Sequence, residues 1–276
     1  MKVLIFGGKG YFGQCFKRIY PEASSPDSDI ANPGAVAEAL DREQPDVVIN
    51  CAGKTGRPNV DWCEDHKMET LRSNVTGPIV LLEACMKRHL YFVQMSTGCI
   101  YEGNNGGRGF SEDDPPNFMG SFYSLSKGWS DQMLQKFPIL QLRLRMPFDG
   151  VPHERNLITK LVKYSRVLDA ENSLTAIPDF LNAAKTLIEK KKIGTYNIVN
   201  PGSLSPFRVM ELYREIVDPK HSFTKLTLAE LPSAVRAGRS NCTLSIEKLK
   251  KESMTMRPLE EVMLQALRDY ASHQED

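Results

Sequence analysis

The chain has 276 residues, 41% hydrophobic and 25% charged, a composition typical of a folded globular protein that excludes the disordered, collagen-like and coiled-coil classes. Its 35 basic and 34 acidic residues leave a net charge of +1, so no broad positive field attracts nucleic acid or an anionic membrane. A chain of this length forms one large domain or two smaller ones.

Cysteine spacing and hydropathy indicate the cellular compartment. The cysteines are widely spaced and include no C-x-x-C pair, which predicts free thiols in a reducing compartment. The apolar start of the chain is shorter than the h-region of a signal peptide. Runs such as Val47–Ile49 and Ile79–Leu82 are far shorter than the about 20 residues of a membrane span. We therefore expect a soluble, cytoplasmic protein. The six cysteines are Cys15, Cys51, Cys63, Cys85, Cys99 and Cys242.

Short β-branched strands alternate with amphipathic helices through the first half of the chain. This alternation predicts an α/β fold, a Rossmann-type doubly wound parallel sheet with ligands beyond the carboxyl ends of the strands. The segment Glu22–Ser28 is a poor strand, so the second strand is expected to be short or absent. The predicted strands are Val3–Phe6, Asp46–Asn50, Tyr91–Met95 and Leu140–Leu144, and the predicted helices are Gly10–Tyr20, Pro33–Glu43, Lys67–Lys87 and Phe122–Lys136.

After about Gly150 the pattern changes to helices joined by irregular segments. We expect a dinucleotide-binding lobe over residues 1–150 and a smaller mixed α/β lobe, mainly substrate-binding and continuous with the first, over 151–276. Residues 274–276 are expected to fray. The predicted elements are a helix over Asn156–Arg166, a strand over Thr195–Val199, a helix from Ser205 to Val217 and a final amphipathic helix over Leu259–Tyr270.

A glycine-rich loop follows the first strand and opens the first helix. Its glycines permit a tight turn and let backbone N–H groups approach a pyrophosphate at the positive end of the helix. The sequence therefore predicts a dinucleotide site, with a purely structural glycine turn as the alternative. The loop residues are Gly7, Gly8, Lys9, Gly10, Tyr11, Phe12 and Gly13.

An acidic residue is expected about 20 residues beyond such a loop, on the adenosine ribose. Asp29 stands there, and its alternative role is to cap the helix that begins at Pro33. Lys9 is the only basic residue of the loop able to reach a 2′-phosphate, so the choice between NAD and NADP stays open.

Several longer peptides give a more specific signal than the loop. They are Asn50–Gly53, Gly56–Glu64, Ser96–Tyr101, Pro116–Lys127, Arg145–Pro147, Arg155–Lys160 and Arg239–Asn241. Together they resemble the extended short-chain dehydrogenase/reductase family over essentially the whole chain. Within it the chain looks like the nucleotide-sugar branch, and most of all like bifunctional NDP-4-keto-6-deoxyglucose 3,5-epimerase/4-reductases of NDP-L-rhamnose synthesis. It departs from that pattern in its curtailed second strand and at Ser245, where an aspartate is expected.

Tyr123 and Lys127 are four residues apart, so they share one face of a helix. An ammonium there stabilises a tyrosinate and helps the phenol to transfer a proton; the alternative is an ordinary amphipathic pair. Thr97 ends a predicted strand at the ligand edge, where its hydroxyl can bind a substrate carbonyl oxygen. Ser96 is the less favoured substitute.

Cys99 lies two residues beyond Thr97, on the same side if the strand continues. Its thiol can exchange a proton with an acidic carbon, and the alternative is a buried core cysteine. The resemblance implies Lys160 as the second acid/base of a 3,5-epimerase, although a lysine on such a helix is usually solvated. His153 is a rival with no spacing argument.

The resemblance also implies binding residues. Cofactor contacts are implied for the glycine loop and for Asp29, Ile30, Cys51, Ala52, Gly53, Tyr123 and Lys127, and substrate contacts for Arg57, Asn59, Asp61, Trp62, Asn156 and Arg239. The alternatives are an ordered surface loop capped by Asp61 and an exposed surface charge at Arg239.

The implied activity is reduction and epimerisation of a UDP- or dTDP-linked 4-keto sugar with NADP(H), or alternatively NAD(H), and without a metal. A homodimer is a further implication. One alternative is a 4-keto-reductase alone, similar to dTDP-4-dehydrorhamnose reductases. The other is a non-catalytic, cofactor-binding regulatory subunit, since the methionine adenosyltransferase regulatory subunit also resembles this branch.

Overall fold

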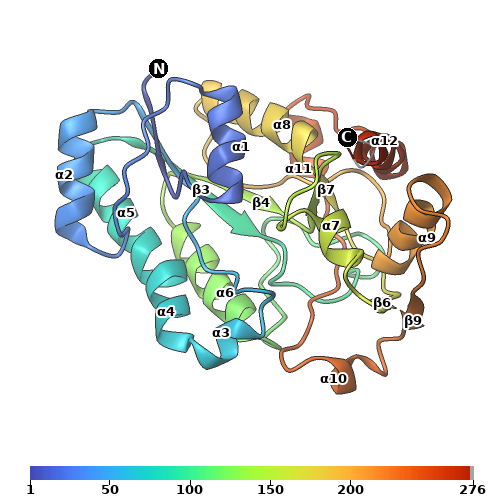
Figure 1. Ribbon diagram of the computed structural model, residues 1–276. Helices are drawn as coiled ribbons and strands as arrows, with labels where there is room; N and C mark the ends of the chain where they lie inside the picture. Colours follow the sequence, from blue (N-terminus) through green and yellow to red (C-terminus); the bar gives the residue numbers. More distant parts are fainter. Residues whose placement is uncertain (274–276) are drawn as a thin grey trace. The chain divides into compact units, whose positions relative to one another are not determined.

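The computed structural model describes residues 1–273 and forms two compact units (Figure 1). The first unit comprises Met1–Ile100, Pro115–Arg143 and Ala184–Tyr196. The second comprises Tyr101–Asp114, Leu144–Ala183 and the chain from Asn197 on. The tail predicted to fray, 274–276, lies outside the described residues.

A five-stranded sheet forms the centre of the first unit. Its strand order is β1-β2-β3-β4-β8, and β1 and β3 both pair with β2 in parallel. Every residue of β1, β2 and β4 is buried, as expected when helices cover both faces of a parallel sheet. The predicted Rossmann-type sheet is confirmed. The strands are β1 (Val3–Phe6), β2 (Val47–Asn50), β3 (Tyr91–Thr97), β4 (Leu140–Leu144) and β8 (Gly194–Asn197).

The expected short second strand is reduced to one bridge between Leu4 and Ser24. The Ser24 N–H donates to the Val3 carbonyl at 3.1 Å, and the Ser24 carbonyl accepts the Ile5 N–H at 2.9 Å. Because Ser24 pairs with one edge of β1 and β2 with the other, the strand order reverses at β1. Such a reversal is where doubly wound sheets bind their ligands, and the glycine loop follows β1 at that point.

The helices of the first unit pack their apolar residues on alternate strand positions. Leu4, Phe6, Val48 and Phe92 share one core cluster with Leu40 of α2 and with Leu81, Leu82 and Cys85 of α5. Figure 1 shows α2 and α5 side by side on this part of the sheet. The helix predicted over Lys67–Lys87 contains a π turn, η1. The elements are α1 (Tyr11–Ile19), α2 (Pro33–Glu43), α3 (Trp62–Asp65), α4 (Lys67–Leu71), η1 (Arg72–Thr76), α5 (Gly77–Lys87) and α6 (Phe122–Leu134); α8 (Ile177–Glu189) includes residues of both units.

The second unit has its own core, formed chiefly by α12 and α9. Val262, Met263 and Leu267 of α12 are buried in one cluster with Val209 and Met210 of α9, so the periodicity predicted for the last helix is confirmed. The strands are β5 (Pro147–Phe148) paired with β7 (Thr175–Ala176) and β6 (Arg166–Leu168) paired with β9 (Thr224–Leu226). The helices are α7 (Leu157–Leu161), α9 (Pro206–Ile216), α10 (Leu231–Ala234), α11 (Glu247–Lys251) and α12 (Leu259–Ser272).

One predicted helix of this unit is wrong in length. The helix expected over Asn156–Arg166 ends at Leu161, and Arg166 belongs to β6. The Ser165 carbonyl accepts the N–H of Thr224 at 2.8 Å. Because this segment is hydrogen-bonded to β9, its backbone groups cannot also form the hydrogen bonds of a longer helix. Within residues 1–273, no helix combines the length and the apolarity that crossing a membrane requires.

Candidate active site

The glycine loop packs closely against the segment that follows β2. Gly7 has φ +76°, and a Cβ on Gly7 would lie 2.5 Å from the Ala52 nitrogen. A Cβ on Gly13 would lie 2.3 Å from the Gly7 carbonyl oxygen. Gly10 caps α1 without a side chain, so backbone alone forms the positive end of that helix. This cradle, which a side chain would fill, fits the pyrophosphate of a dinucleotide.

Asp29 forms an ion pair with Arg72. Its Oδ2 accepts the Arg72 guanidinium at 2.8 Å, and its Oδ1 accepts the Ala31 N–H at 2.9 Å. The hydrogen bond from Arg72 is the main reason why the pKa of Asp29 lies below its usual value. Asn32, which accepts the N–H groups of Gly34 and Ala35, is the N-cap of α2. The alternative that Asp29 caps this helix is therefore wrong.

The glycine loop carries one basic residue, Lys9, which is paired with an acidic residue. The Lys9 ammonium forms an ion pair with Asp27 at 2.6 Å, and both side chains are exposed. Ile30 is 4% exposed and belongs to the core cluster around Leu4. Cys51 follows β2, and burial raises the pKa of its thiol.

The helix α6 carries Tyr123 and Lys127. It begins after Ser121, whose hydroxyl accepts the Ser124 N–H at 3.1 Å, and Glu64 accepts the Phe122 N–H at 2.7 Å. The Ser121 cap and the Glu64 carboxylate of α3 therefore both stabilise the start of α6, within one helical turn of Tyr123.

Lys127 connects α6 to the end of β3. Its ammonium donates to the Met95 carbonyl at 3.1 Å, and Tyr123 and Lys127 are 9% and 8% exposed. Burial lowers the pKa of Lys127 from 10.5 to about 8, against the opposing effects of Asp131 and Cys99. The ammonium is thus buried on one helix face with Tyr123 and still carries its charge at neutral pH.

The end of β3 differs in part from the prediction. The strand extends to Thr97, and the Thr97 hydroxyl accepts the Cys99 N–H at 3.1 Å. The strand does not continue to Cys99, so the alternation argument for that residue fails and a turn places it instead. Cys99 is half-buried and acts electrostatically on Lys127. The Ser96 hydroxyl donates to Asp131 at 2.6 Å, so it is bound within the protein.

The sequence reasoning missed Asn74. This residue lies in η1 and is 1% exposed. Its amide nitrogen donates to the Lys54 carbonyl at 2.9 Å and to the Ser126 hydroxyl at 3.2 Å, and its oxygen accepts the Lys54 N–H at 2.8 Å. Asn74 thereby ties the segment after β2 to α6. The sequence pattern does not single out this residue, because Arg72, Ser73 and Thr76 beside it are polar as well.

The segment between β2 and α4, which includes α3, carries four of the predicted substrate residues. Arg57 is exposed, and Asn59 accepts the Asp61 N–H at 2.9 Å. Trp62 stacks on His66 with the ring centroids 3.9 Å apart, and the Lys54 ammonium lies 5.5 Å from the Trp62 ring. Asp61 is the N-cap residue of α3, and its side chain makes no capping hydrogen bond there.

Three further predicted residues belong to the second unit. Asn156 is the buried N-cap of α7: its oxygen accepts the Ile158 N–H at 3.0 Å and its nitrogen donates to the Asp149 carbonyl at 2.6 Å. Lys160 lies in the same short helix and is half-buried. Arg239 is also half-buried and donates to the Ala237 carbonyl at 2.6 Å, so it is not an exposed surface charge.

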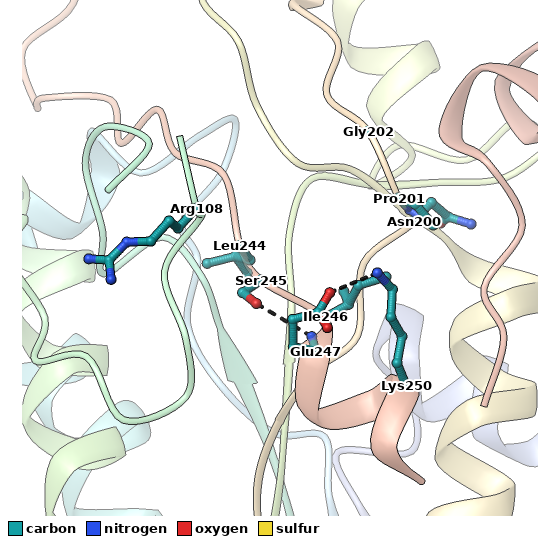
Figure 2. Close-up of a pocket in the computed structure, with 9 residues that line it drawn as sticks. All are labelled: Arg108, Asn200, Pro201, Gly202, Leu244, Ser245, Ile246, Glu247 and Lys250. Carbon is teal, nitrogen blue, oxygen red and sulfur yellow. Dashed lines mark hydrogen bonds and ion pairs between the residues drawn. The ribbon is translucent and has the colours of Figure 1, made fainter. Parts of the chain in front are cut away.

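A cavity of about 210 Å³ lies in the second unit (Figure 2). Glu247 pairs with Lys250 at 2.7 Å along its wall, and Ser245 lines it. None of the predicted catalytic or binding residues is among its lining residues, so the cavity is not assigned to the substrate. Within the described part of the chain, His, Cys, Asp and Glu form no group that could hold a metal ion.

Comparison with known proteins identifies the family. The family model described as the RmlD substrate binding domain matches residues 1–272. The chain belongs to this family. A bifunctional dTDP-4-dehydrorhamnose 3,5-epimerase/reductase of Arabidopsis thaliana is 38% identical, over 83% of this chain and 79% of that protein. A trifunctional UDP-glucose 4,6-dehydratase/epimerase/reductase of the same plant is 34% identical, but this chain spans only 41% of it.

Solved structures agree with the fold and the family. The UDP-rhamnose synthase of Acanthamoeba polyphaga mimivirus has a TM-score of 0.92 and 30% identity, with 98% of this chain and 99% of that chain covered. A dTDP-4-dehydrorhamnose reductase of Bacillus anthracis in complex with NADP has a TM-score of 0.81 at 21% identity, with 99% of each chain covered. The second match supports the Rossmann-like α/β fold alone.

Proposed function

We propose that this chain is a nucleotide-sugar 3,5-epimerase/4-keto-reductase, which converts an NDP-4-keto-6-deoxy-D-glucose to an NDP-L-rhamnose with NADP(H). One observation carries the proposal: the glycine loop and the Tyr123–Lys127 helix belong to one compact unit, with the Lys127 ammonium on the Met95 carbonyl at the carboxyl end of β3. The names of two relatives that are matched over most of their length, an epimerase/reductase and a UDP-rhamnose synthase, support it.

In the reduction, Tyr123 donates a proton to the alkoxide that forms at C4 of the sugar. The buried Lys127 ammonium stabilises the resulting tyrosinate and holds the nicotinamide ribose. The Thr97 hydroxyl orients the C4 oxygen. A bound nicotinamide cofactor supplies the hydride, and the glycine loop with the start of α1 holds its pyrophosphate.

In the epimerisation, the C4 ketone acidifies the protons on C3 and C5. Inversion at each carbon requires removal of a proton from one face and its return to the other. We assign these proton transfers to Cys99 and Lys160, with Arg57, Asn59, Asp61, Trp62, Asn156 and Arg239 as the substrate-binding set. Arg239 suits the diphosphate because a guanidinium offers paired donors.

The finer properties are also proposals. The sugar carries UDP or dTDP, NADP(H) is the first choice of cofactor and NAD(H) the second, and the protein forms a homodimer. The exposed Trp129 and Met133 of α6 are apolar surface that such a dimer would cover. The cytoplasmic location remains a prediction.

The direct test is incubation of the purified protein with the 4-keto sugar and NADPH or NADH. We expect oxidation of the reduced cofactor and formation of the L-sugar. Absence of oxidation with both cofactors would refute the reductase. If cofactor bound without any activity that Tyr123→Phe abolishes, the regulatory-subunit alternative would replace the enzyme.

A second test, in deuterated water, separates the bifunctional enzyme from a reductase alone. Deuterium at C3 and C5 of the product requires epimerase chemistry. Cys99→Ser should lose this label and still transfer hydride when pre-epimerised substrate is supplied. Label that persists in Cys99→Ser would remove Cys99 from the mechanism, and its absence from the wild-type product would leave only the reductase.

A further inference from the structure

A fully buried ion pair connects the Tyr123–Lys127 helix to β4. Asp131 of α6 and Arg143 of β4 both have side chains that are 0% exposed. The Arg143 guanidinium approaches both carboxylate oxygens, with Nη2 at 2.5 Å from Oδ1 and Nε at 3.0 Å from Oδ2. The Ser96 hydroxyl donates to Oδ2 at 2.6 Å and the Gln135 amide to Oδ1 at 2.9 Å. Four donated hydrogen bonds therefore hold this carboxylate in one position.

Stability alone does not account for such a pair. Desolvation of two charges offsets much of their attraction, so apolar residues of similar volume often stabilise a fold equally well. The position of the pair points to the site instead. Asp131 lies one helical turn after Lys127 on the same face, and its partner Ser96 directly precedes Thr97. One carboxylate is thus connected to both elements that carry the candidate catalytic groups.

Asp131, one helical turn from Lys127 on α6, favours the charged form of that lysine. Of the two groups that favour the charged form of Lys127, the other is the thiol of Cys99, after β3. Several charged groups on the neighbouring elements contact residues other than Lys127. Glu64 of α3 and Lys67 of α4 contact Phe122, Arg72 of η1 pairs with Asp29, Glu83 of α5 pairs with Lys87, and Arg143 of β4 pairs with Asp131.

We propose that Asp131, held by Arg143, is a positioning residue of the reductase site: it fixes a negative charge behind Lys127 and anchors Ser96, so that the ammonium stays charged in its place at the end of β3. This inference rests on the proposed function for Tyr123 and Lys127. The buried position opposes the charge on Lys127, whose pKa is already lowered to about 8. Without the carboxylate, the ammonium would lose its proton within the working pH range.

The test follows the titration of Lys127 itself. The ¹³Cε resonance of Lys127 is observed in protein labelled at lysine, and it is assigned by its loss in Lys127→Arg. We expect its midpoint to fall by about one pH unit in Asp131→Asn, and by less in Asp131→Asn/Arg143→Gln, which leaves no unpaired buried charge. Gln135→Ala, which removes a neutral donor to the same carboxylate, is the matched control and should leave the midpoint unchanged.

The pH profile of kcat/KM for keto-sugar reduction is the second measurement. In the Asp131 variants, the alkaline limb should shift to lower pH together with the Lys127 midpoint. In Gln135→Ala, the pH of the alkaline limb should not change. The double variant decides the question if Asp131→Asn does not fold. A midpoint that does not move in a folded variant, or an alkaline limb that does not follow it, overturns the inference. If the wild type reduces no keto sugar, the proposed function fails, while the titration still decides the role of Asp131 toward Lys127.

Discussion

The close packing of the glycine loop predicts a large effect of Gly13→Ala. The new Cβ would lie 2.3 Å from the Gly7 carbonyl oxygen and 2.5 Å from the Gly8 Cα. Both atoms are backbone, so the loop itself has to move. Overpacking of this kind costs ~1–3 kcal/mol, whereas alanine in a helix gains ~0.5–1 kcal/mol over glycine. We expect a net loss of ~1–2 kcal/mol in the free energy of unfolding.

The same movement displaces the amides at the start of α1, so cofactor binding should weaken by about tenfold or more, which is ~1.4 kcal/mol. Urea denaturation measures the first effect, and fluorescence titration with NADPH and NADH measures the second. Gly34→Ala is the matched control, because its Cβ in the first turn of α2 would meet only Asn32 Oδ1, at 3.5 Å. It should retain or increase stability and leave cofactor affinity unchanged. A Gly13→Ala protein that is as stable as the wild type and binds the cofactor equally well would refute the packing argument and the location of the site.

Three further predictions concern single side chains. Lys127→Met should abolish reduction but raise the free energy of unfolding at neutral pH. The reason is that lysine has a pKa of 10.5 in the unfolded chain, whereas burial lowers its pKa in the folded protein to about 8. This difference is worth up to ~3 kcal/mol. Because the unfolded chain binds the extra proton between these two values, the gain should fade as pH rises through that window, and a gain independent of pH in urea denaturation would contradict the reasoning. Asp27→Asn frees Lys9 from its 2.6 Å ion pair and should strengthen NADPH binding several-fold relative to NADH in fluorescence titrations; an unchanged ratio would exclude Lys9 from the 2′-phosphate site. Asn156→Ala removes the N-cap of α7 and a donor to the Asp149 carbonyl, so urea denaturation should show a loss of ~1–3 kcal/mol, and wild-type stability would contradict the structural role of its amide.

Local patterns predicted much of the first unit. Alternating strands and helices predicted the parallel sheet, since a buried strand and an amphipathic helix each leave a period in the sequence. The glycine loop after β1 and the four-residue spacing of Tyr123 and Lys127 are local features as well, and the structure places both as expected. The longer peptides pointed to the family that the comparisons then showed.

Other features depended on partners far away in the chain. The helix expected over Asn156–Arg166 ends early because β9, some sixty residues on, pairs with its last part. Cys99 is placed by a turn onto the Thr97 hydroxyl, which a strand pattern does not predict. The sequence pattern did not predict the structural roles of Asn74, Glu64 and Asp131. These roles arise from hydrogen bonds to residues distant in the chain or on another element, namely Ser126, Phe122 and Arg143.

By itself, then, the sequence determined the fold class, the loop that fits a dinucleotide and the pair of side chains suited to proton transfer. These depend on residue type and short spacing, which set backbone conformation and shared helix faces. Only the tertiary structure decided which polar groups surround that pair. Burial and long-range hydrogen bonds set the charge of Lys127 and the fixed position of Asp131, and these depend on which distant residues the fold brings into contact.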